Sequence, residues 1–187
     1  MEAISKTSRI EKLFKLGLVI IASTVLITIS AKIKIPFYPV PMTMQTFVIL
    51  LIGITFGYKI GLAIVTLYLL EGILGLPVFA SSPEKGVGII YFTGPTMGYL
   101  IGFLIAVYLA GIFKFNKNLI NTFLKLIFAV SFIYILGLIW LGILIGWDKP
   151  IFKLGAEPFL LAELFKILLL SFLTPTILKL KKLIKIT

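Results

Sequence analysis

Two oppositely charged residues interrupt an apolar run near the end of the sequence. Glu163 and Lys166 lie three residues apart, so a helix would place both on one face. Inside a membrane-spanning helix a charged side chain costs about 2.5–3.5 kcal/mol and therefore faces a bundle interior or a cavity. The two could pair only with each other, or extend to the membrane surface. Lys166 would lie roughly 10 Å into the helix at about 1.5 Å per residue, which favours contact with a polar ligand.

A proline-rich segment is the second candidate for chemistry. Pro36, Pro39 and Pro41 fall close together, which excludes a helix and keeps the chain extended. The segment leads to Thr43 and Gln45 at the start of an apolar run. It could be a rigid turn in which Thr43 caps the following helix. Alternatively, Gln45 faces a ligand, because its side-chain amide both donates and accepts hydrogen bonds.

A third segment, residues 72–99, combines glycine, proline and aromatic residues. Its aromatic side chains could pack on a flat or apolar ligand. Aromatic residues are equally typical of a membrane interface, and for any one of them that is the simpler interpretation. The candidates in this segment are Phe79, Tyr91, Phe92, Thr96 and Tyr99.

The composition places this chemistry in a membrane protein. Of 187 residues, 60% are hydrophobic and 13% are charged, whereas soluble domains are about 45–50% apolar and about 25% charged. A chain of this length cannot bury so large an apolar fraction in a water-soluble core. The 18 basic residues give a net charge of +11, but they stand at the ends of apolar runs. That pattern is typical of topology signals and of contact with anionic lipid, and it argues against a nucleic-acid partner.

The sequence excludes most enzyme chemistry. It has no cysteine and no histidine, so disulfides, thiolate or imidazole catalysis and zinc sites built from Cys or His are excluded. It also lacks the Gly-x-x-x-x-Gly-Lys-Ser/Thr phosphate loop of many nucleotide-binding proteins. We therefore expect no enzyme, no metal and no cofactor, but a binding protein or a transporter subunit.

Six apolar runs are candidate transmembrane helices; a crossing needs roughly 20 residues, and the second run is short. A basic head precedes the first run, as in a signal peptide, but no small-x-small cleavage site follows, which favours an uncleaved helix. The second and third runs are separated by three residues and predict a tight helical hairpin. We expect an all-α integral membrane protein, a single domain over residues 1–187. The six runs are 13–30, 46–56, 60–74, 96–113, 119–145 and 159–178.

The basic residues predict the orientation of these helices. With a cytoplasmic N-terminus, twelve Lys and Arg residues fall on the inside and five on the outside, as the positive-inside rule requires. Both termini are then cytoplasmic. Three segments, residues 32–45, 76–93 and 147–158, would share the outer face. Irregular backbone at a membrane must be covered by protein or line a wet cavity, so these segments predict a lid over an outward-facing pocket.

The three loop motifs, in this order, resemble the BioY family, the biotin-specific substrate-binding (S) component of energy-coupling factor (ECF) transporters. The resemblance covers essentially the whole chain. Its motifs are Pro39-Val40-Pro41-Met42-Thr43-Met44-Gln45-Thr46, Gly75-Leu76-Pro77-Val78-Phe79-Ala80, Gly94-Pro95-Thr96-Met97-Gly98-Tyr99 and the late Glu163-x-x-Lys166.

The resemblance implies a six-helix bundle with both termini inside and a biotin pocket beneath the outer loops. It also implies that Gln45, residues of the 94–99 segment and the Glu163/Lys166 pair contact biotin. Two positions depart from the family pattern. Glu163 stands where an aspartate is common, so the carboxylate reaches further, and Met97 stands where a glycine is common and could narrow the pocket or turn away from it.

The resemblance also implies partners and a location. Such S components work with a transmembrane coupling protein and two ATP-binding-cassette (ABC) ATPases in a prokaryotic plasma membrane. The candidate biotin-binding residues are Thr43, Gln45, Phe79, Tyr91, Thr96, Tyr99, Glu163 and Lys166. Two alternatives are a related subunit for another vitamin and a membrane scaffold protein without a transport role.

Overall fold

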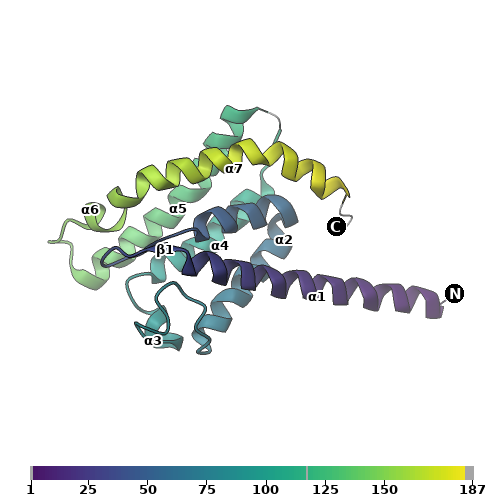
Figure 1. Ribbon diagram of the computed structural model, residues 1–187, viewed down its shortest axis with the longest axis horizontal. Helices are drawn as coiled ribbons and strands as arrows, with labels where there is room; N and C mark the ends of the chain where they lie inside the picture. Colours follow the sequence, from purple (N-terminus) through teal and green to yellow (C-terminus); the bar gives the residue numbers. More distant parts are fainter. Residues whose placement is uncertain (1, 117, 184–187) are drawn as a thin grey trace.

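The structure is a computed structural model that describes residues 2–116 and 118–183. It is built almost entirely of helices (Figure 1). Lys117 and Lys185, which contribute to the predicted orientation, lie outside the described residues. The elements are α1 (Glu2–Lys32), β1 (Lys34–Ile35), β2 (Met42–Thr43), α2 (Gln45–Ile73), α3 (Gly88–Phe92), α4 (Met97–Ile112), α5 (Leu119–Ile145), α6 (Ile151–Gly155) and α7 (Glu157–Leu183).

Four of the described helices are long and apolar enough to cross a membrane, namely α1 from Ile10, α2, α5 and α7. Helix α4 is apolar but shorter. Large apolar side chains such as Leu18, Phe128 and Phe165 are exposed on these helices, as expected of surfaces that face lipid tails rather than water. The protein is therefore a multi-pass membrane protein.

The predicted fifth run coincides with α5, and the predicted fourth run differs from α4 by one residue at each end. The second and third runs are the two halves of α2, which the chain joins at Gly57. Gly57 has a φ of 77°, a conformation that favours glycine because it has no Cβ. Figure 1 shows the two halves running in different directions. The predicted hairpin is therefore present as a break within the single element α2.

The proline-rich segment is extended, as predicted. Lys34 pairs with Thr43 and Ile35 with Met42 in a short antiparallel hairpin, β1–β2. Of the two alternatives for this segment, the one in which Thr43 caps the helix does not hold. Met44 occupies the cap position and makes no side-chain capping bond, while the Thr43 hydroxyl only accepts a 3.3 Å hydrogen bond from the backbone N–H of Gln45.

Small residues let the central helices approach closely. A Cβ on Gly53 of α2 would lie 2.7 Å from both the Val107 carbonyl and the Ala110 Cβ of α4. A Cβ on Gly102 of α4 would lie 2.6 Å from the Cα of Ile133 on α5. In lipid, where helices gain little from hiding apolar surface, such close packing holds the bundle together.

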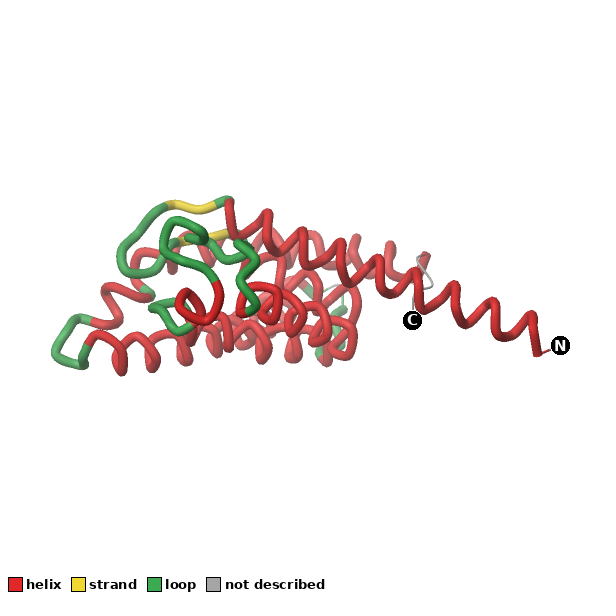
Figure 2. Tube along the Cα trace, turned by 90° about the horizontal axis from the view of Figure 1, so that it is seen from below, coloured by secondary structure: helices red, strands yellow, loops and turns green. Residues whose placement is uncertain are grey.

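The long loops gather at one end of the molecule. Figure 2 shows the hairpin and most of the loops at the end opposite the two termini. Hydrogen bonds tie this end to the long helices: the Trp140 indole of α5 donates to the Gly94 carbonyl at 2.8 Å, and the Tyr99 hydroxyl of α4 donates to the Gly155 carbonyl of α6 at 2.8 Å. The three segments predicted to share one face do so, and both described ends of the chain lie on the other side.

Candidate ligand-binding site

An inner cavity of about 60 Å³ lies beneath the gathered loops. The hairpin, the start of α2, the loop after α2, the short helix α3 and helices α4, α5 and α7 form its wall. Its lining is mainly apolar and aromatic with a few convergent polar groups, the usual composition of a small-molecule site. The lining residues are Val40, Pro41, Met42, Thr43, Gln45, Thr46, Phe79, Ala80, Tyr91, Thr96, Tyr99, Leu100, Phe103, Ile133, Tyr134, Phe159, Glu163 and Lys166.

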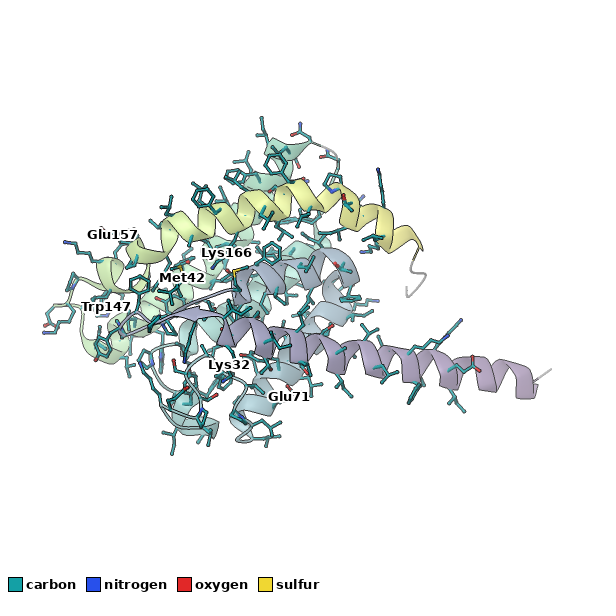
Figure 3. The ribbon with its side chains drawn as sticks, viewed as in Figure 1. Lys32, Met42, Glu71, Trp147, Glu157 and Lys166 are labelled. Carbon is teal, nitrogen blue, oxygen red and sulfur yellow. The ribbon has the colours of Figure 1, made fainter. Side chains whose placement is uncertain are left out.

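Lys166 joins α7 to the hairpin across this cavity. Its ammonium group donates to the Thr43 carbonyl at 2.7 Å, to the Thr46 hydroxyl at 3.2 Å and to Glu163 Oε2 at 3.3 Å. Figure 3 shows Lys166 reaching from α7 toward the hairpin, where Met42 also lies. The side chains of Lys166 and Glu163 are 10% and 5% exposed. The pair therefore does not extend to the membrane surface.

The two oxygens of the Glu163 carboxylate differ in their partners. Oε2 accepts hydrogen bonds from Thr46 at 3.0 Å and Tyr134 at 3.1 Å, besides its ion pair with Lys166. Oε1 is buried and has no partner among the described residues. Leaving a buried polar atom unsatisfied costs about 1–3 kcal/mol, and more for a charged group. A ligand with an N–H or O–H donor would remove that cost.

Gln45 is a second buried polar group in the wall, 4% exposed. Its amide N–H donates to the Tyr68 hydroxyl at 2.8 Å, and that hydroxyl donates to the Val78 carbonyl at 3.2 Å. The amide oxygen of Gln45 accepts from the Thr43 hydroxyl at 3.2 Å. These bonds fix the orientation of the amide and use one of its two N–H groups.

Aromatic rings form the apolar part of the wall. Phe79 is 1% exposed, stacks on Tyr91 with ring centroids 5.2 Å apart and meets Tyr68 edge to face at 5.6 Å. A Cβ at Gly72 would collide with the Phe79 ring, so the ring occupies the space that this glycine leaves. On the other side, Tyr99 meets Tyr134 edge to face at 6.2 Å.

The structure brings all eight predicted site residues to this one cavity. Phe92, also considered from the sequence, packs against Phe79 and is not part of the lining. Met97, at a position where the family pattern has glycine, does not line the cavity either. Glu71 lies elsewhere and accepts a 3.0 Å hydrogen bond from Thr24 of α1.

Sequence reasoning missed Tyr134, which contacts Glu163 directly. The available signal was a hydroxyl group in the middle of the apolar run 119–145, since buried tyrosines usually find a hydrogen-bond partner. Thr46 also lines the cavity and donates to Glu163, although it was quoted in the proline-rich motif and not among the candidate site residues. The remaining missed lining residues are apolar and carry no signal in a sequence that is apolar throughout. They are Val40, Pro41, Met42, Ala80, Leu100, Phe103, Ile133 and Phe159.

An outer cavity of about 260 Å³ adjoins the inner one. The two share Pro41, Tyr91 and Thr96, and the outer one is also lined by Tyr38 and Lys85 from the loops. The inner site is thus reached from the loop end of the molecule.

Comparison with known proteins agrees with this geometry. The model of the BioY family matches residues 5–183. The biotin transporter BioY of Thermotoga maritima is 35% identical over 161 residues, covering 86% of this chain and 92% of that protein. The probable biotin transporter BioY of Pyrococcus horikoshii is 35% identical over 141 residues, covering 75% of this chain and 82% of that protein.

A solved structure has the same fold. The S component for biotin from an ECF-type ABC transporter superimposes with a TM-score of 0.73 at 25% identity, covering 92% of this chain and 93% of that one. The family match over nearly the whole chain and the two relatives lead to one conclusion: the chain belongs to the BioY family.

Proposed function

We propose that this protein is the biotin-binding S component of an ECF-type vitamin importer. The observation that carries the proposal is the buried Glu163 carboxylate, one oxygen of which has no partner among the described residues, in the cavity of a BioY family member. Biotin offers a ureido group with two N–H donors and a carbonyl acceptor, an apolar bicyclic ring and chain, and a terminal carboxylate. Each part has a counterpart in the wall.

The charges favour one orientation of biotin. A ureido N–H can donate to Glu163 Oε1, and the ureido oxygen can accept from Lys166 or from the second N–H of Gln45. The aromatic rings of Phe79, Tyr91 and Tyr99 surround the apolar ring system. A biotin carboxylate placed beside Glu163 would be repelled, because like charges in a low-dielectric site cost several kcal/mol. The ureido end therefore lies deepest and the carboxylate points toward the outer cavity.

The topology follows from the same proposal. Counting the two halves of α2 separately and including α4 gives six crossings, and the excess of basic residues places both termini in the cytoplasm. The loops and cavities then face the outside of a prokaryotic plasma membrane. The chain is not an enzyme, and we propose that it needs no cofactor and no nucleic acid.

Energy must come from other subunits, because the sequence has no phosphate loop. We assign that role to a transmembrane coupling protein and two ABC ATPases, as the family implies. The structural match to an S component of an ECF-type transporter supports such partners in general. The number of coupling proteins and ATPases is part of the proposal.

Equilibrium binding to the purified protein in detergent tests the function. We expect a dissociation constant for biotin in the nanomolar range, with thiamin and riboflavin binding far more weakly. Glu163→Gln and Lys166→Ala should each weaken biotin binding at least about tenfold, or about 1.4 kcal/mol, whereas Lys149→Ala, which alters an exposed pair with Asp148, should not.

Three results would contradict the proposal. Tighter binding of another vitamin would assign the chain to a different substrate. No binding of any vitamin would favour a scaffold role. Losses of less than threefold in both Glu163→Gln and Lys166→Ala would remove this pair from the site.

A further inference from the structure

Lys32 at the end of α1 and Lys34 in β1 bind backbone carbonyls of the loop that follows α2. The ammonium group of Lys32 donates to the carbonyls of Phe79 at 2.7 Å and Ser82 at 2.6 Å, and lies 3.5 Å from the Ser82 hydroxyl. The ammonium group of Lys34 donates to the Ala80 carbonyl at 2.8 Å. Figure 3 shows Lys32 beside the loop that leads to α3. We call Lys32 and Lys34 the lysine anchor.

All three N–H donors of the Lys32 ammonium group have an acceptor in the loop. An ammonium group has three N–H donors and no acceptor, and three oxygens of the loop surround it. Hydrogen bonds from a charged donor are roughly twice as strong as neutral ones. The Ser82 hydroxyl also donates to the Phe79 carbonyl at 2.8 Å, so this small loop is closed on itself around the ammonium group.

Lys34 is held less firmly. Besides its one short bond to Ala80, it lies 3.7 Å from Glu84, whose side chain is 67% exposed. An exposed ion pair of this kind contributes little. Lys32 is therefore the stronger member of the anchor.

The anchored loop carries part of the ligand-site wall. Phe79 and Ala80 line the inner cavity, whereas neither lysine lines the inner or the outer cavity. The side chain of Phe79 is positioned by Tyr68 and Tyr91. Its backbone, and that of the residues that follow it, is held by the lysine anchor. The ammonium groups of both lysines therefore reach the ligand site through this loop, while the backbone of Lys34 also pairs with Thr43 of the inner wall.

We propose that Lys32 and Lys34 are positioning residues for the ligand site, which fix the Phe79–Ala80 wall to the end of α1 before a ligand arrives. A wall that is ordered in advance does not have to be ordered when the ligand binds, and affinity rises accordingly. The consequence for biotin rests on the proposed function, but the ordering of the loop does not.

Hydrogen exchange of the ligand-free protein tests the ordering directly. In Lys32→Met, whose apolar side chain has a similar length, the amides of residues 79–86 should exchange at least about tenfold faster than in the wild type. Amides in the middle of α5 should not change. Lys32→Arg keeps the charge and the donors and should restore most of the protection. Lys149→Met is the matched control, and its exchange should equal that of the wild type.

Biotin titration of the same variants tests the link to the site. Lys32→Met should weaken binding about tenfold and Lys34→Met about threefold, mainly through a slower association rate, since the loop must first be ordered. In a Phe79→Ala background, Lys32→Met should have little further effect, because coupled residues are not additive.

Each outcome has a defined meaning. Unchanged exchange of residues 79–86 in Lys32→Met overturns the proposal, whatever biotin does. Faster exchange with an unchanged biotin affinity also overturns it, since the loop would then be irrelevant to the site. If the wild type binds no biotin, the proposed function fails, while the exchange experiment still decides whether the anchor orders the loop.

Discussion

Two regions of the bundle are built on different physical principles. Around Gly53 and Gly102, helices α2, α4 and α5 are held by close contact between small residues and backbone. Around Glu163 and Lys166, a buried carboxylate and an ammonium group share partners with Thr46 and Tyr134, and one carboxylate oxygen has no partner among the described residues. In the first region the helices pack directly against one another, whereas in the second we propose that a ligand supplies the missing partner of Glu163 Oε1. Substitutions in the two regions should therefore affect different properties.

The largest effect is expected from added volume in the packed region. Gly53→Val would place side-chain atoms against the Val107 carbonyl and Ala110. Overpacking costs about 1–3 kcal/mol or more when the neighbour is backbone, so the melting temperature of the ligand-free protein should fall by at least about 5 °C. Gly17→Val is the control, because a Cβ there meets nothing within 4 Å. An equal melting temperature for both variants would show that this contact does not hold the bundle together.

Substitutions around Glu163 and Lys166 should have a smaller effect, and it should fall on biotin binding rather than on folding. Tyr134→Phe removes one of the donors to Glu163 Oε2 and keeps the ring against Tyr99. A lost hydrogen bond of this type is worth about 0.5–1.5 kcal/mol, so biotin affinity should fall about threefold to tenfold with little change in melting temperature. The control is Glu71→Gln, which alters a partly buried polar contact outside the cavity.

Titration calorimetry with biotin, at several concentrations of the detergent-solubilised protein, would measure the biotin affinity of both variants. If Glu71→Gln weakened biotin binding as much as Tyr134→Phe, the separation between the two regions would be wrong. A fall in melting temperature without a change in affinity for Tyr134→Phe would assign that hydroxyl to folding alone.

Much of the architecture could be predicted because a membrane imposes a simple rule on sequence. Apolar runs had to become helices, and α5 matched its predicted bounds. The break at Gly57 falls within the three residues that separate the predicted second and third runs. The short helices α3 and α6 could not be predicted, because each depends on contacts with distant segments. The sequence left open whether Thr43 caps a helix, and it does not, because its carbonyl and hydroxyl bind Lys166 and Gln45 instead.

The site could be predicted where polar residues stand out against lipid-like surroundings. Glu163, Lys166 and Gln45 are conspicuous for that reason, and the structure gathers them at one cavity. Apolar lining residues such as Leu100 and Ile133 could not be distinguished from the many others that face lipid. The lysine anchor was missed for a related reason: Lys32 and Lys34 were interpreted only as charges at a helix end, and nothing in the sequence indicates the carbonyls that they bind.

A structure of the protein with biotin bound is the most direct test of the central claim, that the site is completed by a ligand donor to Glu163. A ureido nitrogen should lie about 2.7–3.2 Å from Glu163 Oε1, with the biotin carboxylate toward the outer cavity. Biotin bound with its carboxylate innermost, or with Glu163 Oε1 paired to another protein group and no ligand nitrogen within reach, would contradict it.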